Sequence, residues 1–414
     1  MEKLIVEGGR PLCGVIRVSG SKNAALPLLF ASVLTEETCV IENVPVIRDV
    51  EIALQILACM GAQIRSVGSA AIEIETKNMR PILPPPDLVS ELRASTYLMG
   101  AMLGRFGRAY VQDFGGCNFS PRPIDMHLQA AQRLGAALSE GVLSAPKGLF
   151  GAVLPFEKVS VGATVNALLM ASSAKGITVI ENAACEPHVE NLIAFLQSMG
   201  AVIFRMGNAL VVEGRALHGG LSSVVGDMIE GGTYLLAGLA TGGRVTVKGC
   251  DVAHLGAFLS CLADGGAEIF SSEEEITLSG TLSAPLFIKT APYPAFPTDL
   301  QPQAAFTAAC FSGGVVTEGV FSKRFGYLSS LASMGLSYVK SESTAYVFPS
   351  HLHAASVTAE DLRGGAALLL AALSASGKSE ISSAYRILRG YENIVEKFSS
   401  LGANIKLIKE EKGI

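Results

Sequence analysis

The sequence predicts an α/β protein of two domains, assembled from six copies of one strand–helix–strand–helix–strand–strand repeat. The chain has 414 residues, 49% hydrophobic and 17% charged, which suits two or three folded domains and excludes a disordered chain. One pattern recurs: an amphipathic helix, then Gly, a small residue and a strand. Its glycines are residues 61, 135, 200, 266, 335 and 402, at spacings of 74, 65, 66, 69 and 67. So regular a series indicates an internal repeat.

The copy around Gly200 gives the physical basis of the pattern. Leu192, Phe195 and Met199 fall on one helical stripe, and Gly200 supplies the left-handed residue that ends the helix. Two short apolar strands are expected next, on either side of a turn at residues 207–208. Each copy therefore ends in a helix followed by a hairpin.

Every copy also contains an earlier helix, which precedes the amphipathic one and is apolar on most of its faces. The expected ranges are 24–34, 95–103, 165–173, 231–239, 303–311 and 364–374. Helices of this kind belong in a domain interior, with sheets packed around them. We place three copies in each domain. The first domain is predicted at residues 22–226, and the second at residues 1–21 and 227–414, with the N-terminal segment returning as a strand.

Charge and composition exclude several classes of protein. Lys and Arg number 32 against 37 Asp and Glu, a net charge of −5, whereas a sequence-independent nucleic-acid binder should be basic. The longest apolar stretch, near residues 366–375, is about half a bilayer span. The N-terminal residues do not have the pattern of a secretory signal. The eight cysteines contain no C-x-x-C pair and fit no zinc pattern. We expect a cytoplasmic protein with no nucleic-acid or membrane partner and no metal; its oligomeric state stays open.

The junctions before the six interior helices give a test for function, because helix N-termini attract anions through free N–H groups and the helix dipole. Three junctions carry a cation, namely Lys22, Arg93 and Arg363. Two others carry carboxylates alone, and one is a small-residue turn. If these ends face a cleft between the domains, the cleft gathers the three cations. Each junction taken singly is also consistent with an ordinary helix cap.

Two further segments carry unusual residues. Cys117 lies in the sequence Gly-Gly-Cys-Asn-Phe-Ser-Pro-Arg-Pro at 115–123. A thiol in a Gly-Gly turn beside Arg122 could have a depressed pKa and act as acid, base or nucleophile, although a structural cysteine is the simpler interpretation. Arg386 and Arg389 lie at the entry of the final helix, where surface charge is the simpler interpretation.

The ordered set of motifs resembles a known family. The motifs are Gly-Ser-Lys-Asn-Ala-Ala at 20–25, Leu-Arg-Ala-Ser at 92–95, Gly-Cys at 116–117, Arg-Pro-Ile-Asp at 122–125, Ser-Val-Gly-Ala-Thr at 160–164, Phe-Pro-Thr-Asp at 296–299, Arg-Phe at 324–325, Asp-Leu-Arg at 361–363 and Arg-Gly-Tyr-Glu at 389–392. Together they resemble the enolpyruvyl transferases, and among them the UDP-N-acetylglucosamine 1-carboxyvinyltransferases, over essentially the whole chain. The resemblance implies two inside-out α/β barrel domains with three repeats each.

The same resemblance implies the reaction. The enolpyruvyl group of phosphoenolpyruvate would pass to the 3′-hydroxyl of UDP-N-acetylglucosamine with release of phosphate, the first committed step of peptidoglycan synthesis. No cofactor is implied. Two alternatives stay open: a sibling enzyme acting on shikimate 3-phosphate, and a non-catalytic sensor of UDP-sugars. The Cys117 loop and the pair Lys22 and Asn23 argue against the first, and the retention of both Cys117 and Asp299 argues against the second.

Residue roles also follow from the resemblance. Cys117 is similar to the family's proton donor, and Asp299 to its base or orienting carboxylate. Phosphoenolpyruvate needs fixed cations, which bidentate Arg suits. The residues implied for it are Lys22, Arg122 and Arg389 for phosphate, Arg324 and Arg363 for carboxylate, and Asn23 beside them. The residues implied for UDP-N-acetylglucosamine are Arg93, Arg122, Pro123, Ile124, Asp125, Met126, Ser160, Val161, Gly162, Ala163, Asp299 and Val320.

Four positions depart from the family pattern. Ser322 and Lys323 stand where many members have Glu-Asn, Leu388 replaces an acidic residue, and Met228 replaces an Arg. These changes affect hydrogen bonding around the site and closure of the cleft, and they leave the residues named above intact. A catalytically weak paralogue therefore remains a further alternative.

Overall fold

The computed structural model describes residues 2–68, 70–115 and 122–409. Within them the chain divides into two compact units, each with its own hydrophobic core. Of the described residues, the N-terminal unit comprises 20–68, 70–115 and 122–225, and the C-terminal unit comprises 2–19 and 226–409. Cys117 lies outside the described residues.

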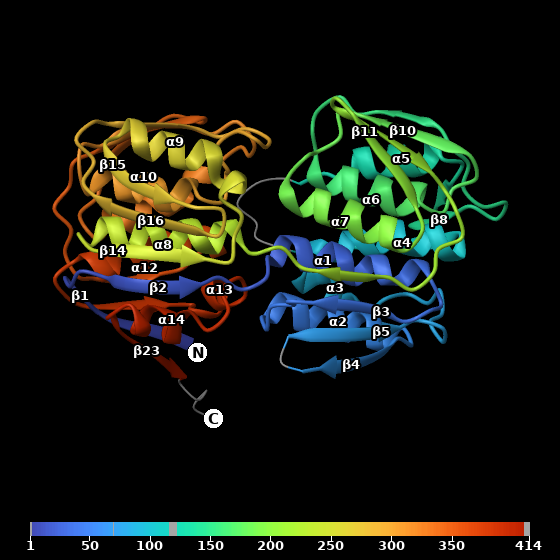
Figure 1. Cartoon of the computed structure of the whole chain (residues 1–414), viewed down its shortest axis with the longest axis horizontal. Helices are drawn as coiled ribbons and strands as arrows, with labels where there is room; N and C mark the ends of the chain where they lie inside the picture. Colours follow the sequence, from blue (N-terminus) through green and yellow to red (C-terminus); the bar gives the residue numbers. More distant parts are fainter. Residues whose placement is uncertain (1, 69, 116–121, 410–414) are drawn as a thin grey trace. The chain divides into compact units, whose positions relative to one another are not determined.

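The N-terminal unit is a mixture of helices and short strands (Figure 1). Its helices are α1 (Lys22–Ala31), α2 (Arg48–Cys59), α3 (Pro86–Glu91), α4 (Thr96–Phe106), α5 (Asp125–Arg133), α6 (Val161–Ala171) and α7 (Pro187–Ser198), with 3₁₀ turns η1 (Ser32–Leu34) and η2 (Arg93–Ser95). Its strands are β3 (Cys39–Glu42), β4 (Gln63–Val67), β5 (Ala71–Glu75), β6 (Arg108–Tyr110), β7 (Ala137–Ser139), β8 (Val142–Ser144), β9 (Val153–Pro155), β10 (Ile177–Glu181), β11 (Val202–Met206), β12 (Ala209–Glu213) and β13 (Leu221–Ser223).

The C-terminal unit repeats this plan. Its helices are α8 (Met228–Ala240), α9 (Gly256–Asp264), α10 (Gln301–Ala309), α11 (Tyr327–Ala332), α12 (Leu362–Ser374), α13 (Tyr385–Leu388) and α14 (Ile394–Ser400), with η3 (Val252–Leu255) and η4 (Arg324–Gly326). Its strands are β1 (Glu2–Gly8), β2 (Cys13–Arg17), β14 (Arg244–Lys248), β15 (Ala267–Ser271), β16 (Glu275–Gly280), β17 (Leu286–Lys289), β18 (Gly314–Thr317), β19 (Ser337–Lys340), β20 (Thr344–Phe348), β21 (Ser356–Thr358), β22 (Gly377–Ser382) and β23 (Asn404–Lys409).

Three helices form the interior of each unit, as the apolar pattern predicts. They are α1, α4 and α6 in the N-terminal unit, and α8, α10 and α12 in the C-terminal unit, and nearly all of their residues are buried. Figure 1 shows α8, α10 and α12 enclosed by strands of their own unit. Because these helices are apolar on most faces, sheets must cover them from several sides. The predicted α/β fold with interior helices is confirmed.

The six sheets share one strand order. The orders are β13-β3-β5-β4, β6-β8-β7 and β9-β10-β12-β11 in the N-terminal unit, and β2-β14-β16-β15, β17-β18-β20-β19 and β21-β22-β1-β23 in the C-terminal unit. In each four-stranded sheet the first two strands are parallel and the others antiparallel. In three of these sheets an interior helix connects the two parallel strands, which is the connection that a parallel pair requires; β2 and β13 instead pair with strands that do not follow them directly in the chain.

The six glycines of the repeat share one backbone conformation. Their φ angles lie between +98° and +104°, a region that favours glycine and that ends the preceding helix. The repeat predicted from the glycine spacing is therefore present in the backbone.

The second repeat departs from the prediction, because its sheet has three strands among the described residues. Where the first strand was expected, a proline run leads into α3, with Pro86 as its first residue. Proline has no N–H to donate to a sheet, and it suits the first turn of a helix. Within the run, Pro84 is buried and Pro86 is exposed.

The chain passes between the units twice, and each passage exchanges a strand. The strand before α1 is β2, which pairs with β14 in the C-terminal unit, and the strand before α8 is β13, which pairs with β3 in the N-terminal unit. Backbone bonds pin both passages: Ser21 N–H donates to Val225 O over 2.7 Å, and Asp227 N–H to Ser19 O over 2.9 Å. The sixth repeat takes its last strand, β1, from the start of the chain.

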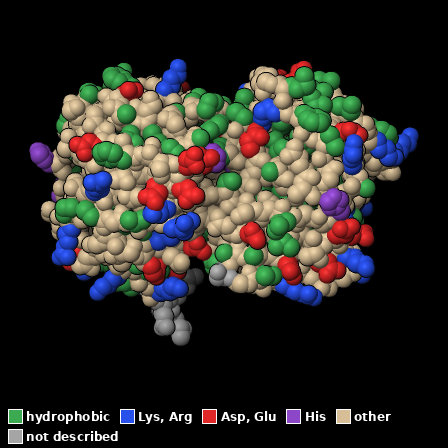
Figure 2. Space-filling model, viewed as in Figure 1, with side chains coloured by type: hydrophobic (Ala, Val, Ile, Leu, Met, Phe, Trp, Pro, Cys, Tyr) green, Lys and Arg blue, Asp and Glu red, His purple; other side chains and the backbone are tan. Residues whose placement is uncertain are grey.

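The surface and the helix lengths bear on the excluded classes. Figure 2 shows Lys and Arg side chains interspersed with Asp and Glu on the face drawn, without one extended basic surface. In the described part of the chain, no helix combines the length and the apolar character needed to cross a bilayer.

Candidate active site

The first cation of the N-terminal unit begins the interior helix α1. Lys22 is the first residue of α1, and its Nζ lies 3.2 Å from Oδ2 of Asp49 in the first turn of α2. The two side chains are 13% and 5% exposed. Asn23 follows Lys22 and is half-buried. Asp49 therefore holds the ammonium at the start of an interior helix.

Arg93, the first residue of η2 before α4, lies close to Arg122, which precedes α5. Arg93 donates through Nη1 to Phe114 O over 3.4 Å and through Nη2 to the backbone oxygen of Arg122. Burial, and then the charge of Arg122, lower the pKa of Arg93. The two cations stay close because backbone carbonyls accept from Arg93, and the site therefore favours anions.

The residues proposed for the nucleotide lie at the starts of α5 and α6. The half-buried Ile124 is the residue before α5, and Asp125 begins that helix. Pro123 and Asp125 are exposed, and Met126 packs against the core. Ser160 caps α6, accepting from Ala163 N–H over 3.3 Å. Both starts present backbone N–H groups of a helix.

A buried histidine that the sequence reasoning missed connects these two starts. His127 on α5 is 5% exposed, and its Nδ1 lies 2.8 Å from Nδ2 of Asn166. The Asn166 Oδ1 accepts from Gly100 N–H, so its amide donates to Nδ1 and the ring proton is assigned to Nε2. Burial, and then Arg93, lower the pKa of His127 to about 4. A side chain at Gly162 would lie 3.2 Å from Nε2.

In the C-terminal unit one carboxylate bridges two arginines. Asp299 Oδ1 accepts from Arg324 Nη2 over 3.2 Å, and its Oδ2 accepts from Arg363 Nε over 3.2 Å and Nη2 over 3.1 Å. The arginine side chains are each 4% exposed, and that of Asp299 is 26% exposed. Asp299 precedes α10, and Arg363 is the second residue of α12. The sequence predicted all three for one site, and the structure brings them together.

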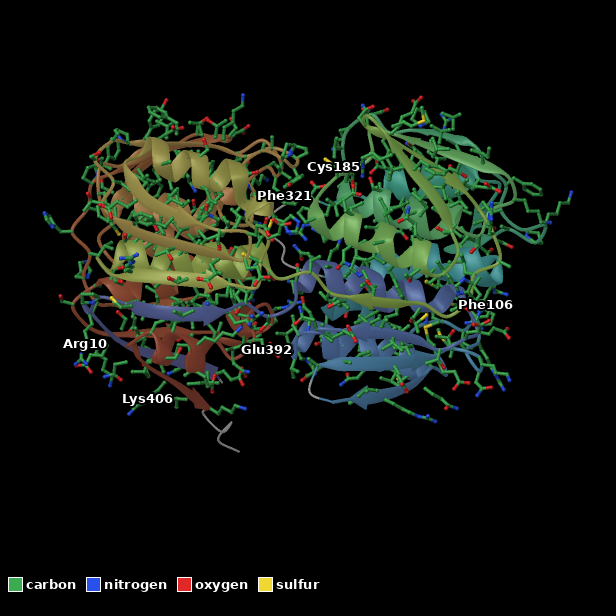
Figure 3. The ribbon with its side chains drawn as sticks, viewed as in Figure 1. Arg10, Phe106, Cys185, Phe321, Glu392 and Lys406 are labelled. Carbon is green, nitrogen blue, oxygen red and sulfur yellow. The ribbon has the colours of Figure 1, made fainter. Side chains whose placement is uncertain are left out.

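The electrostatics of this cluster favour charged side chains. Burial acts to lower the pKa of Arg363, but the adjacent Asp299 carboxylate outweighs it and raises this pKa above its usual value. The guanidinium of Arg363 lies 5.4 Å from the ring centre of Tyr391. The guanidinium of Arg324 lies 5.6 Å from the ring centre of Phe321, which is labelled in Figure 3. Each arginine therefore has a carboxylate and an aromatic face as partners.

Two other residues of the predicted site lie in the same unit. Arg389 follows α13 and is half-buried. The next residue, Gly390, packs so closely on Leu362 that a Cβ would lie 2.6 Å from its side chain. Val320 is 39% exposed and follows β18; it and Asp299 lie in the C-terminal unit, whereas the other residues predicted for the nucleotide lie in the N-terminal unit.

Comparisons with known proteins identify the family of the chain. The sequence model of a family described as EPSP synthase (3-phosphoshikimate 1-carboxyvinyltransferase) matches residues 6–398. The UDP-N-acetylglucosamine 1-carboxyvinyltransferase of Shewanella denitrificans is 41% identical over 99% of this chain and 100% of its own length. That of Bacillus cereus, numbered 2, is 41% identical over 98% of this chain and 96% of its own. The chain belongs to the enolpyruvyl transferase family.

Solved structures extend the comparison to the fold. The enolpyruvyl transferase NikO from Streptomyces tendae has a TM-score of 0.86 and 25% identity, with 99% of each chain covered. EPSP synthase from Acinetobacter baumannii has a TM-score of 0.72 at 17% identity, over 99% of this chain and 100% of its own, which speaks for the fold alone. The enolpyruvyl transferase fold is therefore shown for this chain.

The structure adds residues to the site that sequence reasoning did not assign. Asp49, His127 and Asn166 belong to no recognised motif, and nothing in the sequence distinguishes them from other polar residues of amphipathic or apolar helices. Tyr391 lies inside a motif that was recognised, yet its contact with Arg363 depends on tertiary packing. In the described ranges, no group of three or more His, Cys, Asp or Glu side chains could hold a metal ion.

Proposed function

We propose that the protein transfers the enolpyruvyl group of phosphoenolpyruvate to the 3′-hydroxyl of UDP-N-acetylglucosamine and releases phosphate, the first committed step of peptidoglycan synthesis. The observation that carries this proposal is 41% identity, over 99% of the chain, to an enzyme named for carboxyvinyl transfer to that sugar nucleotide. We take the two compact units as the two domains, with three repeats each. We place the reaction in the cytoplasm, and this location stays a prediction.

Arg324 and Arg363 are proposed to hold the carboxylate of phosphoenolpyruvate. Their two positive charges face one negative charge on Asp299, so the cluster keeps a net positive charge. The Nη1 of Arg363 is buried and has no hydrogen-bond partner among the residues that the structure describes. A guanidinium presents parallel N–H groups that match a carboxylate. This donor supports the assignment.

The phosphate is proposed to bind Lys22, Arg122 and Arg389, with Asn23 and Arg93 in contact with the substrates. A phosphate dianion needs several fixed cations, and it binds favourably at the start of a helix, where backbone N–H groups are free. Lys22 at the start of α1 combines both properties. The half-buried position of Arg389 suits a charge-assisted contact.

The reaction moves protons at two atoms. The sugar hydroxyl loses a proton as its oxygen bonds to C2 of phosphoenolpyruvate, while C3 gains a proton and becomes a methyl group. The C2–O bond to phosphate then breaks as C3 returns a proton, which leaves the enol ether and free phosphate. We assign the donation to C3 to Cys117. Asp299, held on both oxygens by arginines, is assigned as the base or orienting carboxylate at the sugar hydroxyl.

UDP-N-acetylglucosamine is proposed to bind where α5 and α6 begin. Backbone N–H groups at both helix starts suit a diphosphate. The neutral ring of His127 adds no charge there. It lies so close to Gly162 that a side chain at that position would crowd the ring. The contacting residues proposed are Arg93, Arg122, Pro123, Ile124, Asp125, Met126, Ser160, Val161, Gly162 and Ala163, with Asp299 and Val320 from the other unit.

Phosphate release from phosphoenolpyruvate tests the proposal. We expect release with UDP-N-acetylglucosamine and none above background with shikimate 3-phosphate. Release with shikimate 3-phosphate alone would favour the activity after which the matching family is described. Binding of the UDP-sugar without release would favour a sensor.

A further inference from the structure

A buried polar scaffold lies beneath the Asp299 cluster. Two glutamines in the first turn of α10, Gln301 and Gln303, are 0% exposed. Residues two apart in a helix point about 200° apart around its axis, so the two amides reach different partners. Nε2 of Gln301 donates to the Tyr327 hydroxyl over 2.9 Å, and Nε2 of Gln303 to the Tyr391 hydroxyl over 3.2 Å.

Each tyrosine is fixed next to an arginine of the cluster. Tyr391 is 2% exposed, and its ring centre lies 5.4 Å from the Arg363 guanidinium carbon. Tyr327 is 3% exposed and follows Arg324 by three residues, in the turn that joins η4 to α11. A Cβ at Gly364 would lie 2.8 Å from that of Tyr327, so this tyrosine packs on the first turn of α12 beside Arg363.

The proton assignments around Tyr391 leave its hydroxyl no freedom. Thr233 donates its hydroxyl to Ile229 O over 2.7 Å, so the Tyr391 hydroxyl must donate to Thr233 Oγ1, 3.0 Å away. Gln303 donates to both oxygens over 3.2 Å. Thr233 on α8 and Gln303 on α10 thus fix the ring of Tyr391, which lies in the segment before α14.

Stability alone does not account for this scaffold. Gln303 Oε1 is buried without a hydrogen-bond partner among the described residues. An unsatisfied amide oxygen in a core costs stability, and a fully apolar core would avoid that cost. The polar groups lie close to the cluster: Gln301 follows Asp299 by two residues, and the ring of Tyr391 contacts Arg363.

We propose that Tyr327 and Tyr391, held by Gln301 and Gln303, are positioning residues that fix Arg324 and Arg363 against Asp299. The scaffold connects the first turns of α10 and α12 with the segment of η4 and α11, and those carry all three charged residues of the cluster. It acts before substrate binds, by limiting the directions in which both guanidinium groups point. The role rests on the proposed function of the cluster.

Isosteric removal of each hydroxyl tests the proposal. Tyr391→Phe and Tyr327→Phe keep the rings and lose the hydroxyl bonds to the glutamines and, for Tyr391, the bond to Thr233. Because a small displacement of an orienting group lowers turnover strongly, we expect kcat to fall about tenfold, and the KM for phosphoenolpyruvate to rise several-fold. The KM for UDP-N-acetylglucosamine should not change. Gln303→Leu should lower kcat less in the Tyr391→Phe background than in the wild type, because both changes remove the bond between Gln303 and Tyr391.

The chain offers a matched control. Tyr234 on α8 is 0% exposed, and its hydroxyl has no hydrogen-bond partner among the described residues. Tyr234→Phe should therefore keep the wild-type kcat and both KM values. A Tyr391→Phe variant with unchanged kinetics, or with equal changes in both KM values, would overturn the proposal, since either result indicates at most a structural hydroxyl.

A second readout separates this inference from the proposed function. Calorimetric titration with phosphoenolpyruvate gives its Kd for the wild type and for each variant. A wild type that binds phosphoenolpyruvate but transfers nothing to UDP-N-acetylglucosamine refutes the proposed function, and the Kd ratios still test the scaffold. Weaker binding in both scaffold variants, with no change in Tyr234→Phe, supports the positioning role. Equal Kd values in all variants overturn it.

Discussion

The two units hold their cations in different ways. In the N-terminal unit, Lys22 pairs with one carboxylate and Arg93 donates to backbone carbonyls. In the C-terminal unit, Arg324 and Arg363 share one carboxylate, lie against aromatic rings and are each 4% exposed at the side chain. Lys22, Arg93 and Arg363 lie at or next to the starts of interior helices, whereas Arg324 lies in η4.

This difference indicates different degrees of preorganisation. The C-terminal cluster is fixed by side chains whose own partners are buried, so little reorganisation is needed when an anion binds. The N-terminal cations are held by backbone carbonyls and by the carboxylate of Asp49, and their arrangement depends more on the ligand. Mutations should therefore affect stability and activity together in the C-terminal unit, and should affect ligand affinity more selectively in the N-terminal unit.

The largest effect is expected for Asp299→Asn. The change removes the only carboxylate that the structure places between Arg324 and Arg363 among the described residues. Loss of a general base or orienting carboxylate should lower kcat by roughly 10²–10⁴-fold. Two buried guanidinium groups would lose their counter-charge, which should lower the free energy of unfolding by about 3 kcal/mol. Phosphate release and urea unfolding measure the two effects.

Asp49→Asn is the matched change in the N-terminal unit. It weakens one charge-assisted bond to Lys22, so the free energy of unfolding should fall by about 1.5 kcal/mol, and kcat should fall less than in Asp299→Asn. If the two variants lost equal stability and equal activity, the proposed difference in preorganisation would be wrong.

Lys22→Ala should have the next largest effect. Removal of a charge-assisted phosphate contact is expected to weaken phosphoenolpyruvate binding by about 1.5–3 kcal/mol, or roughly 10- to 150-fold. Binding of UDP-N-acetylglucosamine alone should stay near that of the wild type. Calorimetry with each substrate checks this. Equal weakening for both substrates would show a general folding defect and would exclude a specific phosphate contact.

The pH dependence of stability should differ between the units. In the N-terminal unit, the pKa of His127 is lowered to about 4, from an ordinary value of 6.5. Between these two values the unfolded chain binds more protons than the folded one, so stability rises with pH. Acidification from pH 6.5 to 4 should destabilise this unit by up to about 3 kcal/mol. Hydrogen exchange of α5 and α6 measures it, and His127→Gln should abolish the dependence.

The C-terminal unit should respond in the opposite direction through Glu230. This side chain is 2% exposed; burial outweighs Lys397 and raises its pKa to about 7, from 4.5. Between these values the folded state binds more protons, so stability is present below pH 4.5 and is lost as the pH rises through 7. Hydrogen exchange of α8 and α14 should slow on acidification, and Glu230→Gln should remove this change. The same sign in both units would contradict the assignment.

Local patterns in the sequence predicted the repeat and much of the C-terminal cluster. The repeat glycines could be found because each needs a positive φ, and Asp299, Arg324 and Arg363 because their motifs resemble those of a known family. The return of the N-terminal segment to the second domain as a strand was predicted, whereas the pairing of β13 with β3 was not, because the pattern of β13 fits either sheet. His127 and the tyrosine scaffold were missed, since their roles depend on contacts such as those of Asn166 and Gln303, which are far apart in sequence.

The smallest effect is expected at the cap of α6. Ser160 accepts one bond, from Ala163 N–H over 3.3 Å, whereas Asp361 caps α12 with two, from Arg363 and Gly364 over 2.9 and 3.0 Å. Ser160→Ala should lower the free energy of unfolding by about 1 kcal/mol. Because Ser160 is also proposed to contact the nucleotide, the KM for UDP-N-acetylglucosamine should rise several-fold while that for phosphoenolpyruvate stays constant. Ser160→Thr keeps the hydroxyl and should restore both properties. A stability loss without any change in that KM would leave Ser160 as a helix cap alone and remove it from the nucleotide site.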